Sequence, residues 1–391
     1  MSDVRTELIE QAARIGREEL GPRAAGLDRE PRYPRESVRA MQEAGFPAVL
    51  IPPEYGGTGM SLAVACRLLD ELAQWCSGTP LVLTSTWTTA FPLLLGGNKA
   101  TRRKWLPAFA AGTAQGCFAV TERGAGNDVG GIRTAARPDG DGWVIDGEKW
   151  FAGNAEAADV FLIAASMDPG AGPTGTCILL VERGTPGLEV GEKIEKMGLR
   201  GAIHSPIRLQ DVRVPADALL AQSKEAFRLL MRTLDLARPL TSAACLGIAR
   251  AALSDSLAYA GERSTFGRPI ADRQQVQRLV AEMAIDIEAG SQLTHPLAEE
   301  IDANFGEFSS VDGPSRFTAR ASMAKLFTSR MVARVATRAV QIHGAAGYVT
   351  GSRVERLYRD ARGAELYEGT SEIHELLIGR DLLRSAARAG G

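Results

Sequence analysis

The sequence predicts an α+β multidomain protein: a helical N-terminal domain (residues 1–114), a middle β-barrel-like domain (residues 115–222) and a C-terminal helical bundle (residues 223–391). Apolar residues recur at helical spacing in the first and last segments, whereas short β-rich runs between Gly, Pro and Asp turns fill the middle one. Strands and helices therefore do not alternate, which argues against a parallel α/β sheet. A chain of 391 residues is long enough for two or three domains.

Helix and strand signals follow one another in that order. In the N-terminal segment, Gly45 is expected to end a helix that contains Val38 and Met41, and Ser61 to cap the next helix. The apolar stripe of that next helix is Leu62, Cys66, Leu69, Leu72 and Ala73. In the middle segment, the predicted strands include residues 143–145, 160–163 and 177–181.

The C-terminal segment carries two long helical stripes and a final helix. The stripes are Val276, Leu279, Val280, Met283 and Ile287, and then Val332, Val335, Ala336, Ala339 and Val340. Between them, residues 299–316 combine acids, glycines and Pro314, and this composition predicts a loop. Apolar residues recur again after Ser371, where the last helix is expected to begin.

Composition excludes several classes of function. The chain is 45% hydrophobic and 24% charged, and its formal net charge of −2 gives no electrostatic footprint for nucleic acid or an anionic membrane. Neither a signal-peptide apolar region nor a long uncharged apolar run occurs, so we expect a cytoplasmic protein. Five scattered cysteines without a C-x-x-C pair fit a reducing compartment. Four unclustered histidines give no reason to expect a metal site.

The most informative motif is YEGTS at residues 367–371. It places Glu368 in a glycine-flanked turn just before the last helix, with Thr370 or Ser371 as a natural N-cap and Glu372 in the first turn. A carboxylate held in this way can serve as a general base, since both its position and its pKa matter for proton transfer. The alternative for the pentapeptide alone is a solvated turn glutamate.

Three further motifs have features of ligand-binding segments. Residues 118–129 form a strand that ends in a glycine-rich bend, where Thr121 and Asn127 can donate to ligand oxygens. Residues 263–270 offer Arg263 as a planar fork for a pyrophosphate and Phe266 as a stacking face; the alternative is a helix end with Phe266 in the core. Residues 341–348 run from a helix into a small-residue turn whose backbone can lie against a ligand.

Together with residues 53–57, 211–215 and 354–360, these ordered motifs make the chain resemble the acyl-CoA dehydrogenase family of flavoproteins over nearly its whole length. The resemblance implies the acyl-CoA dehydrogenase fold: an N-terminal helical domain, a middle β-domain and a C-terminal four-helix bundle, usually in a homotetramer. It implies FAD between the β-domain and the bundle. It also implies α,β-dehydrogenation of an acyl thioester, in which Glu368 removes the α-proton and flavin N5 takes the β-hydride.

The resemblance also assigns binding residues. The FAD contacts it implies are Phe118, Val120, Thr121, Asn127, Phe151, Gly153, Arg263, Phe266, Gln274, Gln341, Ile342, Gly344, Ala345, Thr370 and Glu372, with Arg263, Phe266 and Gln274 supplied by a neighbouring subunit. The substrate contacts it implies are Asn127, Asp235, Arg238, Tyr367 and Gly369. For Asp235 and Arg238 the alternative is an ordinary ion pair on a helix face. Some family members carry the base at the position of Ala237, which cannot act as one.

Several positions depart from the family pattern. Phe151 replaces a tryptophan that shields the flavin, and Gly153 replaces a threonine whose hydroxyl bonds flavin N5. Asn127 replaces a serine near the thioester, and Ala345 replaces a glycine. These departures leave the electron acceptor open, an electron-transferring flavoprotein or oxygen. They also favour a branch that acts on acyl carrier protein as an alternative to coenzyme A. The competing interpretations are a flavin oxidase or monooxygenase on the same fold, and a non-catalytic flavoprotein subunit.

Overall fold

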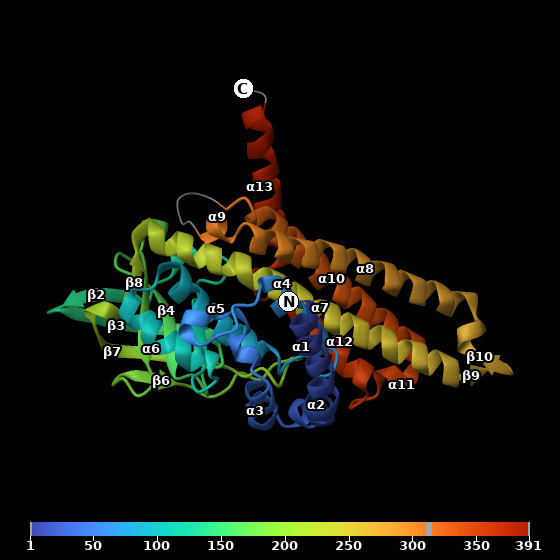
Figure 1. The fold of residues 1–391 in the computed structure, drawn as a ribbon. Helices are drawn as coiled ribbons and strands as arrows, with labels where there is room; N and C mark the ends of the chain where they lie inside the picture. Colours follow the sequence, from blue (N-terminus) through green and yellow to red (C-terminus); the bar gives the residue numbers. More distant parts are fainter. Residues whose placement is uncertain (1, 310–314, 390–391) are drawn as a thin grey trace.

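The computed structural model describes residues 2–309 and 315–389, in which helices, a sheet and a long helical bundle follow one another (Figure 1). The N-terminal helices are α1 (Ser2–Ile15), α2 (Gly21–Arg29), α3 (Arg35–Glu43), α4 (Leu62–Ala73), α5 (Leu81–Gly96) and α6 (Lys99–Ala110). The predicted caps are confirmed. Gly45 has φ 75° just after α3, and the Ser61 side chain accepts a hydrogen bond from the Val64 N–H at the start of α4.

The middle segment folds into one mixed sheet of eight strands. They are β1 (Gly116–Ala119), β2 (Ala135–Asp139), β3 (Gly142–Gly153), β4 (Val160–Ser166), β5 (Thr176–Glu182), β6 (Leu188–Val190), β7 (His204–Pro215) and β8 (Leu219–Gln222). Their order is β6-β7-β3-β2-β4-β5-β8, with β1 parallel to β4. All three predicted strand runs lie within β3, β4 and β5. Both faces of β4 are buried: Leu162 packs in a cluster with α5 and α6, and Phe161 in a cluster on the other face.

The C-terminal segment forms the bundle. Its elements are α7 (Ser223–Glu262), the hairpin β9 (Ser264–Thr265) and β10 (Arg268–Pro269), α8 (Gln274–Ala303), α9 (Phe305–Ser309), α10 (Thr318–His343), α11 (Ala345–Tyr348), α12 (Arg353–Gly363) and α13 (Ser371–Ala389). Helices α7, α8 and α10 pack along their length, and α13 projects away from the body (Figure 1). No helix in the described ranges is both long and apolar enough to span a bilayer.

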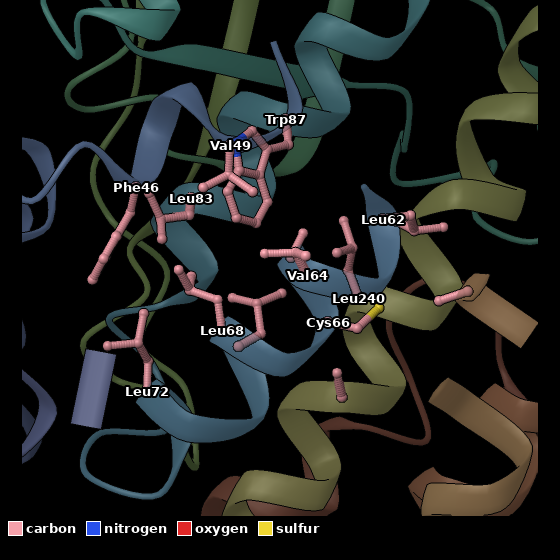
Figure 2. Close-up of a cluster of buried hydrophobic side chains, with 14 of the residues drawn as sticks. Phe46, Val49, Leu62, Val64, Cys66, Leu68, Leu72, Leu83, Trp87 and Leu240 are labelled. Atoms are coloured by element: carbon pink, nitrogen blue, oxygen red, sulfur yellow. The ribbon is translucent and has the colours of Figure 1, made fainter. Parts of the chain in front are cut away.

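A shared core ties the N-terminal helices to the bundle. Figure 2 shows Leu62, Val64, Leu68 and Leu72 of α4 with Trp87 of α5 and Leu240 of α7. The buried Trp87 indole donates to the Pro47 carbonyl at 3.1 Å, so its polar atom is satisfied as burial requires. Because Leu240 is fixed in this core, the middle of α7 is held in place, and Arg238 lies two residues before it.

The loop predicted over residues 299–316 is only partly a loop. Helix α8 continues to Ala303 and α9 follows, while residues 310–314 lie outside the described residues. The acidic residues suggested a solvated loop, but Asp302 is not solvated. Its two carboxylate oxygens accept hydrogen bonds from the N–H groups of Leu62 (2.7 Å) and Ala63 (2.9 Å) at the start of α4. Composition alone does not distinguish this long-range cap from a polar loop.

Candidate active site

The glutamate turn lies between α12 and α13, and its backbone is strained. Glu368 has φ 54° and Gly369 has φ 95°. A non-glycine residue rarely adopts the left-handed region, and such conformations persist only where the surroundings impose them. At Gly369 any side chain is excluded, because a Cβ there would lie 2.9 Å from Nε2 of His374.

Two buried side chains bracket this turn. Lys325 of α10 is fully buried, and its Nζ donates to the Gly369 carbonyl at 2.5 Å. His374, one turn into α13, is also fully buried and neither of its ring nitrogens has a partner among the described residues. Burial and, to a smaller extent, the charges of Arg238 and Lys325 lower the pKa of His374 to about 3, so the imidazole is neutral. Sequence reasoning missed both residues, although a lysine on the apolar face of α10 was a signal.

The carboxylate of Glu368 is not the solvated group that the alternative interpretation described. The residue is half-buried, and its Oε2 is shielded from solvent without a hydrogen-bond partner. Burial raises the pKa of Glu368, while the charges of Arg238 and Lys325 lower it. The site therefore holds a carboxylate in a low-dielectric environment with one oxygen available, which is a geometry suited to accepting a proton.

Asp235 and Arg238 form a buried ion pair on α7, not one on an exposed helix face. Nη1 of Arg238 lies 2.7 Å from Oδ1 of Asp235, and the side chains are 4% and 1% exposed. Thr318 of α10 donates to the other oxygen of Asp235 at 2.6 Å. Since Arg238 also lowers the pKa of Glu368, this pair belongs to the same buried site as the glutamate turn.

The glycine-rich bend after β1 meets the glutamate turn directly. Nδ2 of Asn127 donates to Oγ1 of Thr370 at 2.9 Å, and the Thr370 N–H donates to Oδ1 of Asn127 at 3.4 Å. A buried ion pair anchors the bend: Nζ of Lys149 lies 2.7 Å from Oε1 of Glu122. Beside Asn127, a cavity of about 400 Å³ is lined by Pro173 and by Phe227 and Met231 of α7, and sequence reasoning missed it.

The other predicted residues near the bend lie on β1, directly after β1, and on β3. Phe118 and Val120 are half-buried, and the Val120 carbonyl accepts from Lys149 at 3.0 Å. The Thr121 carbonyl accepts from the Trp150 N–H at 2.7 Å, which ties β3 to the bend. Phe151 is half exposed and has φ 54°.

Arg263, Phe266 and Gln274 lie far from the glutamate turn, at the hairpin end of the bundle (Figure 1). Arg263 follows the last residue of α7, and a helical rise of about 1.5 Å per residue puts it roughly 40 Å from Arg238. Phe266 is 99% exposed with φ 52°, so the alternative that placed it in the core is wrong.

The last predicted binding segment, residues 341–348, runs from the end of α10 into α11. Gly344 has φ 59°, and Gln341, Gly344 and Ala345 are exposed. Ile342 is buried in the bundle core, so only its backbone is available to a ligand. His343 stacks on Tyr259 with ring centroids 4.3 Å apart and serves packing.

Comparison with family models accounts for most of the chain. Residues 2–113 match the acyl-CoA dehydrogenase N-terminal domain, residues 117–212 the middle domain and residues 226–383 the C-terminal domain. The chain is 36% identical over 383 residues to a cyclohexane-1-carbonyl-CoA dehydrogenase of Geobacter metallireducens, covering 98% of this chain and 97% of that protein.

Solved structures share the fold over the whole length. Butyryl-CoA dehydrogenase from Megasphaera elsdenii superposes with a TM-score of 0.93 at 32% identity, covering 98% of this chain and 99% of that one. The prolyl acyl carrier protein oxidase AnaB gives 0.90 at 28% identity, with coverages of 97% and 98%. A glutaryl-CoA dehydrogenase from Mycobacterium smegmatis in complex with FADH2 gives 0.88 at 27% identity, with coverages of 98% and 95%.

Proposed function

The chain belongs to the acyl-CoA dehydrogenase family, and from that premise we propose that it desaturates an acyl thioester between its α- and β-carbons, with FAD as the hydride acceptor. Members of the family are FAD-dependent oxidoreductases that act on CH–CH donors. The single observation that carries the proposal is Glu368, whose shielded Oε2 has no hydrogen-bond donor in the described chain. A general base needs such a free lone pair.

Glu368 is the residue that takes the α-proton. An α-proton beside a thioester is only weakly acidic, so negative charge that develops on the carbonyl oxygen must be stabilised as the proton leaves. Within residues 2–309 and 315–389 the Glu368 N–H donates to no acceptor, so it is available to donate to that oxygen. Burial of the carboxylate strengthens it as a base, because desolvation disfavours its charged form.

The residues present fit FAD. Gly124 and Gly126 in the bend have open space where a side chain would stand, so a flat ring can approach the backbone there. Thr121, Asn127 and Thr370 would contact its ring end, and FAD when bound accepts hydride from the β-carbon. Arg263 and the exposed Phe266 lie too far from this site to reach the same cofactor. In our proposal they hold the adenosine diphosphate half of the FAD in a second copy of the chain.

The substrate thioester enters beside Asn127. The cavity lined by Phe227 and Met231 is also lined by Asn127, which bonds Thr370, so in our proposal this cavity receives the pantetheine arm. That arm occurs both in coenzyme A and in acyl carrier protein. Anaerobic bleaching of the bound flavin by matched acyl-CoA and acyl-carrier-protein substrates tests the function and distinguishes the two carriers.

The same experiment tests the competing interpretations. A flavin that no acyl thioester bleaches would contradict the dehydrogenase and favour a non-catalytic subunit or a monooxygenase. Bleaching followed by fast reoxidation in air with release of hydrogen peroxide would assign an acyl-thioester oxidase. Slow reoxidation by air and fast reoxidation by an electron-transferring flavoprotein is the result that we expect of a dehydrogenase.

A further inference from the structure

Lys325 is a buried charged residue beside the glutamate turn, and the proposed chemistry gives it no role. It projects from the N-terminal half of α10 with no exposed surface, although lysine is almost never fully buried without a partner. Its hydrogen bond goes to the Gly369 carbonyl, the residue directly after Glu368. Burial lowers the pKa of Lys325 to about 8, so the ammonium form still predominates at neutral pH.

The charged and titratable groups around Lys325 come from every element that packs on it. Helix α7 supplies Cys245 and Arg238, the turn supplies Glu365 and Glu368, and α13 supplies the neutral His374. Arg238 is already engaged with Asp235 at 2.7 Å. Lys325 is thus the cation that combines a bond to the turn backbone with an electrostatic interaction with Glu368.

We propose, on the basis of the function proposed above, that Lys325 is a positioning residue for the base: its ammonium holds the Gly369 carbonyl, which keeps Glu368 in its left-handed backbone conformation, and its charge favours the ionised carboxylate. The geometric part rests on the 2.5 Å bond and on φ 54° at Glu368. The two parts act together, because the same Nζ both bonds the turn backbone and interacts electrostatically with the Glu368 carboxylate. In this proposal Lys325 acts through the turn and not on the substrate.

The electrostatic part fixes the sign of a pH effect. Proton abstraction needs Glu368 ionised, so the rate of flavin reduction falls as the pH drops through the Glu368 pKa. Lys325 lowers that pKa. Removing the ammonium therefore raises the pKa of Glu368 and moves the acid limb of the rate profile to higher pH.

Two substitutions separate geometry from charge. Lys325→Met removes both the hydrogen bond and the charge, and Lys325→Gln retains a neutral donor. Replacing a buried charge by an apolar side chain of similar volume is often tolerated, so we expect the methionine variant to fold. Both variants should show the shifted acid limb, and only Lys325→Met should also lose at least tenfold in the pH-independent rate. The control is Arg330→Gln. It removes an exposed cation from the same helix, and that cation pairs with Glu375 of α13.

Single-turnover flavin reduction from pH 5 to 9 measures both effects. Infrared difference spectra of the Glu368 carboxyl, with Glu368→Gln as reference, measure the pKa without turnover. An unmoved acid limb and an unmoved infrared pKa in both lysine variants would overturn the inference and leave Lys325 a packing residue. If the wild-type flavin is not reduced by any thioester, the proposed function fails, yet the infrared titration still decides the role of Lys325.

Discussion

The backbone at Glu368 is as informative as its carboxylate. Seven non-glycine residues of the described chain have positive φ, and three of them, Phe151, Phe266 and Glu368, were predicted site residues. Each such conformation costs on the order of 1–3 kcal/mol, so it persists where surrounding contacts impose it, and it concentrates at functional sites. The strain could not be predicted from the sequence, because Tyr-Glu-Gly reads equally well as a relaxed turn.

Glu368→Gln should leave FAD bound and abolish dehydrogenation. The amide is nearly isosteric with the carboxylate but cannot accept the α-proton, so the chemical step should slow by roughly 10²–10⁴-fold or more. Single-turnover flavin reduction by an acyl thioester measures it, with the flavin-to-protein absorbance ratio as the control for cofactor content. Near wild-type reduction in this variant would remove Glu368 from the mechanism.

Phe151 and Gly153 should determine how electrons leave the flavin. We expect slow transfer to a standard electron-transferring flavoprotein, and recovery in Phe151→Trp combined with Gly153→Thr. The structure permits this change: Gly153 is not among the positive-φ glycines, and a Cβ there would lie 3.0 Å from Oγ of Ser85, which must move slightly. Stopped-flow reoxidation of wild type and double variant decides it. A wild type as fast as a typical family member would make both departures neutral.

At the scale of elements, helix α7 organises the site. Its first turns line the cavity through Phe227 and Met231, its middle carries the buried pair Asp235 and Arg238, and its end leads to Arg263. Helical spacing in the sequence predicted the neighbourhood of Asp235 and Arg238, since residues three apart share a face. Their burial depends on α10, whose Thr318 completes the bonds of Asp235, and no local pattern reports that packing.

We expect Asp302 to stabilise the fold as much as a local N-cap of α4 does. Its carboxylate accepts from the first two N–H groups of α4, so Asp302→Ala should destabilise the fold by about 1–2 kcal/mol, the range for lost caps. Asp302→Asn keeps one acceptor oxygen and should lose less. Urea denaturation measures the loss of unfolding free energy in both variants, and we expect their m-values to be unchanged. Equal stability of alanine variant and wild type would mean that water replaces the carboxylate at no cost.

At the scale of the whole molecule, the order of domains followed from periodicity, because each segment has one dominant repeat over many residues. The contacts that assemble the site did not follow from it. Asn127 meets Thr370 across 243 residues, and Lys325 reaches Gly369 across 44. The family resemblance supplied Asn127 and Thr370 as site residues, but Lys325 and His374 became visible only through packing, since burial decides what a lysine or histidine does.

Arg263→Ala should weaken FAD retention and the oligomer together. Arg263 lies roughly 40 Å along α7 from Arg238, so one chain cannot bring both to a single active site. Its guanidinium can pair bidentately with a pyrophosphate held by a second copy, and Phe266 at the hairpin tip is 99% exposed within one chain. Size-exclusion chromatography with the flavin-to-protein absorbance ratio measures both losses. Arg268→Ala, an exposed arginine of the same hairpin, is the matched control. Full FAD occupancy in an unchanged oligomer would leave Arg263 a helix-end charge and would contradict a site shared between copies.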